Sequence, residues 1–275
     1  MRRIAHISDL HFGRHDPTVA EGLLTALQER RPDLVAVSGD LTQRARSHEF
    51  AAARQFLDRL AVPALVVPGN HDIPLYNLFD RLFRPLSRYS RLITRDRQLV
   101  IIDEKIAVLG INTARGWIGP NGRISTRHVA EIRTGFSDVG PSVLRILVTH
   151  HPLLVPWTSH RLPAVRGARH GIEAIATAGV QMLLSGHYHR QHSAEVGIEY
   201  VAAKRSVLIV HAGTAISTRL REGANSFNLI CIADGQVDCT PYVWDGARFQ
   251  PTSPKRFAIS DSRWRPLTAD VAAAG

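Results

Sequence analysis

Cysteine is scarce in this chain of 275 residues, which contains only Cys231 and Cys239. Two cysteines are too few for a disulfide framework or a thiolate metal site, and this scarcity favours a reducing compartment. Long hydrophobic runs are also missing, because none approaches the roughly 20 residues of a membrane span. The first apolar strand is predicted to begin by Ile4, which leaves no room for a secretory leader. We therefore expect a soluble, cytoplasmic protein.

Lysine is almost as rare: it supplies three of the 34 basic residues, and arginine supplies the rest. With 24 acidic residues, the formal net charge is +10 at pH 7. Such a charge suits an anionic partner, namely a small phosphorylated molecule, a nucleic acid, or an anionic membrane surface or lipid headgroup. An arginine-rich genome would produce the same composition, so both interpretations stay open.

Five short apolar runs each end in side chains that commonly bind metal ions. The runs occupy residues 3–11, 34–40, 64–72, 146–151 and 182–189. Each is predicted to be a buried strand, and ligands of open α/β sheets bind beyond the carboxyl ends of the strands. The sequence therefore predicts one shared metal pocket, with the candidate ligands Asp9, His11, Asp40, Asn70, His150, His187 and His189.

The five motifs differ in specificity. The pair Asp9 and His11 is weak by itself, since so short a pattern occurs by chance in many chains. The string G-N-H-D at residues 69–72 is stronger, because chance should produce it on the order of once in a thousand chains of this length. The string G-H-Y-H at residues 186–189 adds two imidazoles on alternate residues. Chance does not explain all five motifs in this order.

The pattern of apolar residues predicts an α/β fold. Helices are predicted at residues 18–30 and 47–60, the second with Ser47 as its N-cap. Two apolar runs within residues 98–112 predict a hairpin, so the sheet should be mixed rather than purely parallel. After residue 195 the pattern is wholly β, which predicts a second sheet packed on the first. We expect one catalytic domain over residues 1–250 and a loose C-terminal tail over residues 251–275.

Together the motifs resemble the signature of the calcineurin-like metallophosphoesterases: D-x-H, G-D, G-N-H-[D/E], H and G-H-x-H. The match runs through residues 9–189. The resemblance implies a four-layered α/β/β/α sandwich with two mixed sheets that carries two divalent metal ions. It assigns His150 rather than His151, because the family's ligand stands two positions before the proline. One ion would be held by Asp9, His11 and His189, the other by Asn70, His150 and His187, and Asp40 would bridge them.

The implied chemistry is consistent with these residue types. Two divalent ions about 3.5–4 Å apart can clamp the attacking and leaving oxygens of a displacement at phosphorus, and a bridging hydroxide would be the nucleophile. Carboxylate, amide and imidazole ligands without thiolate suit Mn, Fe or Zn. By the resemblance, His71 points at the substrate and protonates the leaving group or stabilises its charge, with Asp72 orienting the His71 ring. Alternatively, Asp72 only caps the following segment.

Residues 112–125 are similar to the class III cyclic nucleotide phosphodiesterases of this superfamily. This favours a phosphodiesterase that acts on a cyclic nucleotide or a small phosphodiester, with Arg44 and Arg219 as candidate phosphate contacts. The alternatives are a pyrophosphatase acting on a nucleotide-diphosphate lipid, a DNA nuclease, and a scaffold without catalytic activity. Members of the pyrophosphatase branch typically carry arginine where this chain has His71, which counts against that alternative.

A basic amphipathic stretch follows the third motif. Its arginines alternate with apolar residues at helical spacing, and Pro85 must interrupt the helix. We hypothesise that this stretch borders the active site and meets an anionic substrate or membrane surface. A solvated helix face is the alternative. The arginines are Arg81, Arg84, Arg88, Arg91 and Arg95.

Overall fold

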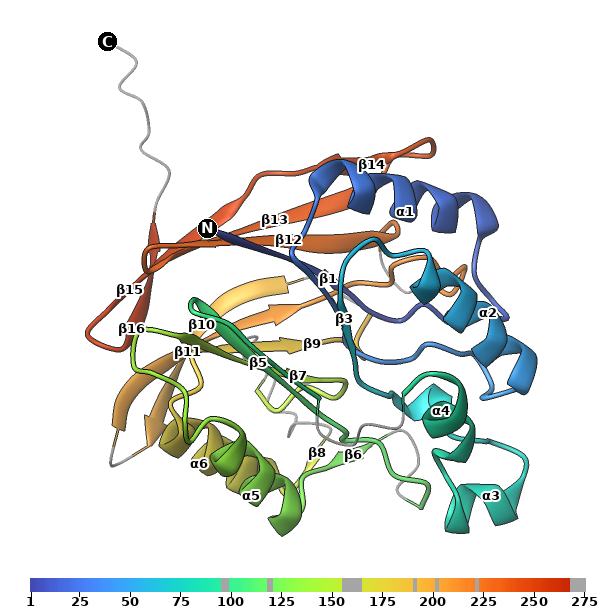
Figure 1. The fold of residues 1–275 in the computed structure, drawn as a ribbon, viewed down its shortest axis with the longest axis horizontal. Helices are drawn as coiled ribbons and strands as arrows, with labels where there is room; N and C mark the ends of the chain where they lie inside the picture. The colour runs from blue at the N-terminus through green and yellow to red at the C-terminus, as the bar shows by residue number, and fades with distance from the viewer. Residues whose placement is uncertain are drawn as a thin grey trace.

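Two sheets pack face to face in the computed structural model, and helices cover their outer faces (Figure 1). The structure describes residues 1–94, 99–117, 121–154, 165–189, 192–200, 203–220 and 223–267. Side-chain placement is described for all of these except 99–102, 192–200 and 203–205. None of the helices in this described part combines the length and apolar character that a transmembrane span requires.

The first sheet joins the N-terminal strands to the C-terminal ones. Its three N-terminal strands run parallel, and β1 pairs antiparallel with β12, so the sheet is mixed. The strand β14 (Phe249–Pro251) pairs with β13 beside the main path. In spatial order the other strands are β16 (Arg263–Leu267), β15 (Lys255–Ser260), β13 (Gln236–Trp244), β12 (Ser226–Ala233), β1 (Arg2–Ile7), β2 (Leu34–Val37) and β3 (Ala64–Val66).

The second sheet is parallel in its centre and antiparallel at both edges. The predicted hairpin around residue 104 is confirmed, because β4 and β5 pair antiparallel at one of these edges. A separate two-stranded ribbon joins β6 (Gly122–Arg123) to β8 (Val165–Arg166). The strands in spatial order are β10 (His192–Tyr200), β11 (Ala203–His211), β9 (Met182–Ser185), β7 (Leu144–Thr149), β5 (Ile106–Ile111) and β4 (Leu99–Ile102).

The helices complete the predicted four-layered sandwich. The first pair packs on the first sheet and the last pair on the second (Figure 1). Two short helices and a 3₁₀ turn lie beyond the end of β3, and the break between the short helices falls at Pro85, as predicted. The helices are α1 (Pro17–Arg30), α2 (Ser47–Asp58), η1 (Asn70–Asp72), α3 (Leu78–Phe83), α4 (Ser87–Leu92), α5 (Thr126–Gly135) and α6 (Ala168–Ala178).

Local sequence explains where the first two helices begin. Asp16 caps α1 by accepting hydrogen bonds from the backbone N–H groups of Thr18 and Val19, at 2.8 and 3.3 Å. The prediction for α2 was wrong by one residue, since Arg46 is the N-cap and Ser47 is the first helical residue. The carboxylate of Glu49, at the third helical position, accepts the backbone N–H of the N-cap residue Arg46 at 3.1 Å, as the glutamate of a capping box does.

The core lies in three layers because both faces of each sheet are covered. In β1, Ile4 packs into the layer between the sheets, whereas Ala5 and Ile7 pack against the helices. Ile146 of β7 enters the layer between the sheets, and Leu147 packs toward α5 and α6. Strands that are buried on both faces must be apolar throughout, which is why the motif strands read as continuous runs.

The prediction of a loose tail from residue 251 was wrong for residues 255–267. They form the β15–β16 hairpin, which extends the first sheet. Phe257 and Trp264 are buried between the sheets, and the Trp264 indole N–H donates to the Gln181 carbonyl at 2.7 Å. The apolar residues within 255–267 are too few and too interrupted for the sequence pattern to predict this hairpin. The last eight residues, 268–275, lie outside the described part of the chain.

We predict that Trp264→Ala lowers the free energy of unfolding by about 3–5 kcal/mol, because it removes a buried indole and leaves a cavity. Trp117→Ala is the matched control, since Trp117 is 69% exposed, and it should change the free energy by less than about 0.5 kcal/mol. Urea unfolding followed by circular dichroism measures both. Equal stability of the two variants would contradict a structural role for the C-terminal hairpin.

Candidate metal centre

The seven predicted ligands come together where the loops after β1, β2, β3, β7 and β9 meet. These loops follow the carboxyl ends of strands from both sheets, so the site lies at one end of the sandwich. Most of the ligand side chains are buried: Asp9, His11 and His150 are fully inaccessible. Their carboxylate and imidazole groups fall into overlapping sets that could hold metal ions, and Asp40 belongs to one set with His11 and to another with His150.

Asp9, His11 and His189 form the first cluster. The Asp9 Oδ1 atom lies 3.7 Å from His11 Nε2 and 3.6 Å from His189 Nε2. These separations are long for hydrogen bonds, and they suit atoms that share an ion at bond lengths of about 2.0–2.2 Å. Among the described residues, Asp9 Oδ1 and His11 Nε2 are buried without a hydrogen-bond partner. Since buried polar atoms are rarely left unpaired, this donor set fits a cation.

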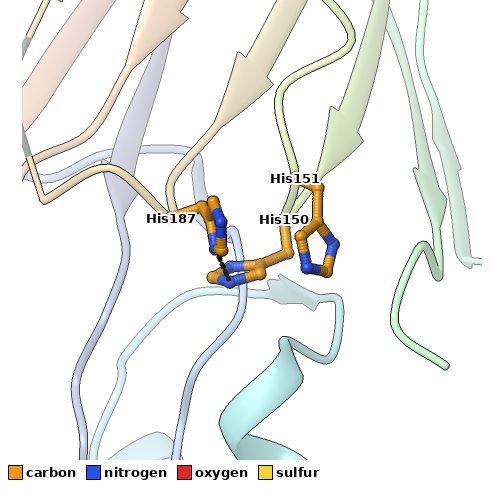
Figure 2. A group of neighbouring side chains, drawn as sticks. All are labelled: His150, His151 and His187. Carbon is orange, nitrogen blue, oxygen red and sulfur yellow. Dashed lines mark hydrogen bonds between the residues drawn. The ribbon is translucent and has the colours of Figure 1, made fainter. Parts of the chain in front are cut away.

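Asn70, His150 and His187 form the second cluster. The Asn70 Oδ1 atom lies 3.1 Å from both His150 Nε2 and His187 Nδ1, and the two nitrogens are 3.3 Å apart. Figure 2 shows the His150 and His187 rings converging from different loops. His150 Nδ1 lies 2.8 Å from the Ser38 carbonyl, which can only accept, so the proton sits on Nδ1. The His150 Nε2 atom faces Asn70, and its lone pair would become available to a metal ion once binding of the ion displaces the Nε2 proton.

Asp40 lies between the two clusters. Its Oδ2 atom is 3.4 Å from His150 Nε2 and 3.9 Å from His11 Nε2, while its Oδ1 atom accepts the His71 backbone N–H at 2.8 Å. Burial opposes the charge on Asp40, but the charge of His150 and its hydrogen bond hold the pKa of Asp40 well below its usual range. Likewise, burial opposes protonation of His150, but Asp40 raises its pKa to about 9. An ionised carboxylate is thus favoured where a bridging ligand was predicted.

The backbone is strained at these ligands. Positive φ angles occur at Asp9 (54°), His11 (48°), Asp40 (53°), His187 (75°) and His189 (58°). Residues other than glycine rarely adopt this conformation, and such strain concentrates at functional sites. The loops therefore hold these side chains in place at an energetic cost that the surrounding core offsets.

The glycines in the motifs leave room for the ligands. A Cβ atom on Gly69 would lie 2.1 Å from Asp40 Oδ1. Gly39 has a φ of +95°, and a Cβ atom there would lie 2.6 Å from His150 Nδ1. Any side chain at Gly69 would displace the Asp40 carboxylate, and one at Gly39 would displace the His150 ring, which explains why glycine precedes the ligands in these motifs.

His151, the neighbour of the predicted ligand, also lies beside the second cluster (Figure 2). Its Nδ1 atom is 2.7 Å from Thr113 Oγ1, and its ring centroid is 4.7 Å from that of His187. His150, by contrast, faces both Asp40 and Asn70. This difference supports the choice of His150 as the ligand and of His151 as a residue that packs behind His187.

His71 stands beside the metal ligands and contacts Arg219. Its Nδ1 atom donates to the Gln43 carbonyl at 2.9 Å, and its Nε2 atom accepts from the Arg219 guanidinium at 3.3 Å. Arg219 Nη1 also lies 3.5 Å from Gln43 Oε1. Gln43 was not predicted as a site residue. The sequence contained one signal for Gln43: it is a polar residue three positions after Asp40, in the loop that follows a predicted buried strand.

Asp72 does not orient the His71 ring, so that prediction was wrong. Its carboxylate accepts hydrogen bonds from the N–H groups of Leu41, Thr42 and Gly69 at 3.2, 2.9 and 2.9 Å. Burial and then the charge of Asp40 raise the pKa of Asp72 to about 6. The backbone donors explain the difference: Asp72 joins two ligand loops, and the Gln43 carbonyl orients the ring instead.

Arg44 lies at a cavity of about 200 Å³ next to the metal ligands. Its guanidinium carbon lies 5.6 Å from the centroid of the Tyr76 ring, within the range of a cation–π contact. A larger cavity of about 550 Å³ lies between β3, α4 and α5, and its described lining contains none of the seven ligands. The smaller cavity is lined by Gln43, Arg44, Asn70, His71, Ile73, Leu75 and Arg81.

We predict that Asp40→Ala reduces metal binding more than any other single substitution of a ligand, because Asp40 borders both clusters. Elemental analysis after equilibrium dialysis against Mn²⁺ measures the number of ions per chain. Asp16→Asn is the control, because Asp16 only caps α1. Undiminished binding by the Asp40→Ala protein, with native circular dichroism, would contradict the assignment of this centre.

A family model for the calcineurin-like phosphoesterases matches residues 2–191 of the chain. The chain is 31% identical over 167 residues to the glycerophosphodiester phosphodiesterase GpdQ of Enterobacter lignolyticus. This match covers 54% of this chain and 57% of that protein. It is 24% identical over 267 residues to the 3',5'-cyclic adenosine monophosphate phosphodiesterase CpdA of Escherichia coli, and this match covers 90% of this chain and 92% of that protein. The matched region thus spans little more than half of the first relative.

Solved structures share the fold at low identity. A dimetal phosphatase from Danio rerio superposes with a TM-score of 0.69 at 12% identity, covering 94% of this chain and 99% of the other. A purple acid phosphatase from yellow lupin gives a TM-score of 0.70 at 12% identity, and the superposition covers 95% of this chain and 54% of the other. The family model covers more than half of the sequence, and the fold and the clustered motif residues agree with it: the chain belongs to the calcineurin-like phosphoesterase family.

Proposed function

We propose that the protein is a binuclear metal-dependent phosphodiesterase that acts on a small phosphodiester. The observation that carries the proposal is the position of Asp40, whose Oδ2 atom lies within 3.9 Å of a nitrogen from each histidine cluster. One carboxylate that reaches both clusters suits a pair of ions sharing a bridging ligand. The donor set contains no thiolate, which suits Mn, Fe or Zn.

When bound, two divalent ions would polarise the phosphate and acidify a water molecule near it. Asp9 and Asp40 are the only carboxylates among the seven ligands, so the occupied centre would keep a positive charge that attracts a phosphate. Arg219 is exposed and adds a cation beside His71. The residues of the chain therefore suit an anionic ester.

His71 is proposed to act on the leaving group. Its ring is held from both sides, since the Gln43 carbonyl accepts the Nδ1 proton and Arg219 donates to Nε2. With the proton on Nδ1, the Nε2 atom must first take a proton from solvent, which it can then donate to the departing oxygen. A substrate phosphate that attracts the Arg219 guanidinium would release Nε2 to face the departing oxygen. His71 and Arg219 would thus work as a pair at the mouth of the site.

The preference for a diester rests on the relatives and on the site together. The two relatives described above carry the names of a glycerophosphodiester phosphodiesterase and a cyclic AMP phosphodiesterase. A diester has two organic arms, and the cavity beside His71 offers Ile73 and Leu75 together with Arg44 to one of them. Cyclic nucleotides and glycerophosphodiesters are accordingly the substrates to compare first.

We predict that the Mn²⁺-loaded protein hydrolyses a bis-aryl phosphodiester in strong preference to the matching phosphomonoester. Initial rates of aryl alcohol release measure both reactions. Asn70→Ala should abolish the diesterase activity, because it removes the amide oxygen that both His150 and His187 face. Asn77→Ala is the control, since Asn77 only caps α3. A preference for the monoester would overturn the proposal, as would turnover that survives in the Asn70→Ala protein.

A second prediction concerns Arg219. Arg219→Ala should lower kcat/KM for the diester by about tenfold to hundredfold, because it removes a charged donor from the phosphate position. Arg219→Lys should recover part of the loss, since lysine keeps the charge without the planar fork. Arg127→Ala serves as the control, because Arg127 pairs with Glu131 on α5. An unchanged kcat/KM in Arg219→Ala would remove Arg219 from the site.

A further inference from the structure

Exposed apolar side chains are concentrated at one corner of the molecule. Among the described residues, ten large apolar side chains are exposed, and seven of them belong to the α3 segment or lie next to it. The helix α3 itself buries none of its residues. Monomeric soluble proteins rarely leave so much contiguous apolar surface uncovered. We call this set the apolar rim: Leu75, Tyr76, Leu78, Phe79, Leu82, Phe83 and Trp117.

Two contacts connect parts of the rim. The rings of Phe79 and Phe83 pack on each other with their centroids 5.1 Å apart. Gly116 lies directly on the end of α3, because a Cβ atom there would be 1.8 Å from the Arg81 carbonyl oxygen. Trp117, which is 69% exposed, follows at once. Residues from two distant parts of the chain thus contribute to one surface.

The apolar rim borders the metal centre. Leu75 lines the same cavity as Asn70 and His71. Tyr76, the next residue, lies under the guanidinium of Arg44, which lines that cavity too. A surface that docks on the rim would therefore lie next to the mouth of the site.

The charge around the rim is positive. Arg84 is exposed and stacks over the Phe79 ring at 5.9 Å, and Arg91 is exposed on α4. Within residues 73–94 the only acidic side chain is Asp80, and it is already paired with Arg88 at 3.1 Å. Exposed aromatic and leucine side chains flanked by arginine are typical of segments that lie in the interface of an anionic membrane.

The two obvious occupants of the rim differ in charge. A second copy of this chain would bring its own arginines against Arg84 and Arg91, with no unpaired acidic group from this segment to oppose them. An anionic bilayer supplies the opposite charge and an apolar interior for the phenylalanine and leucine side chains. The charge pattern therefore favours a membrane over self-association.

We propose that the apolar rim docks on an anionic lipid bilayer and holds the metal centre against the membrane surface. The docking depends only on the rim and its arginines. That the centre then acts on phosphodiesters presented at the membrane surface rests on the function proposed above. Leucine and phenylalanine side chains would enter the headgroup region, while Arg84 and Arg91 would contact lipid phosphates.

The test is flotation of the Mn²⁺-loaded protein with lipid vesicles. We expect binding to vesicles of phosphatidylcholine with phosphatidylglycerol, and much weaker binding to vesicles of phosphatidylcholine alone. Phe79→Ser combined with Phe83→Ser should reduce binding at least tenfold, because two exposed rings would be lost. Leu267→Ser is the matched control, since Leu267 is 39% exposed on β16, and it should not change binding.

A second pair of variants tests the charge. Arg84→Glu should weaken binding by about 25-fold, because each basic group near an anionic surface contributes on the order of fivefold and the reversal counts twice. Arg133→Glu on α5 is the control for net charge and should have a smaller effect, because Arg133 lies outside the rim.

Three results would overturn the docking proposal. These are an absence of binding to anionic vesicles, binding that the rim variants leave unchanged, and a sedimenting dimer that the phenylalanine variants dissociate. Hydrolysis of the soluble bis-aryl diester without vesicles separates this proposal from the function. The phenylalanine variants should keep that activity, so loss of docking with normal hydrolysis would support the rim's role. Vesicle binding by a protein without diesterase activity would contradict the proposed function alone.

Discussion

The centre of this protein depends on one buried carboxylate. Asp40 lies in a loop after β2, where water cannot solvate its charge, yet its pKa is held well below its usual range because His150 lies 3.4 Å away. It also accepts the backbone N–H of His71, which places the third motif. A buried charge is expensive unless it is paired, and here the partners come from separate loops. The loops after β1, β3 and β7 must therefore stay close to Asp40, because each supplies one of its partners.

The two sheets provide the rigid base on which that arrangement rests. Strands buried on both faces end at the same edge of the sandwich, so loops from both sheets meet there. The loops then carry strain, with positive φ at five ligand residues, and they carry glycines where a side chain would collide with a ligand. A well-packed core can hold such strain, whereas an isolated loop would relax it. The cluster geometry is therefore a property of the whole fold.

The motif pattern predicted which residues cluster more accurately than it predicted the edges of the fold. All seven candidate ligands lie together. The sequence could predict this because motif spacing and strand ends are local features of the chain. The prediction failed at the C-terminal hairpin, where Trp264 is buried by a contact with Gln181 that is 83 residues away in the chain. It also failed for Asp72, whose partners include the backbone N–H groups of Leu41 and Thr42 in another loop. Neither contact leaves a signal in local composition.

By itself the sequence determined the class of chemistry, the family, the two-sheet architecture and the residues that cluster at the candidate metal centre, because these depend on residue types and their spacing along strands. Only the tertiary structure decided which groups face one another across the loops. It brought Arg219 into contact with His71, which is 148 residues away in the chain. It also left the apolar rim around α3 exposed beside the cavity that His71 lines. The physical reason is that burial and pairing are set by neighbours in space, and the chain brings those neighbours together only when its three core layers close.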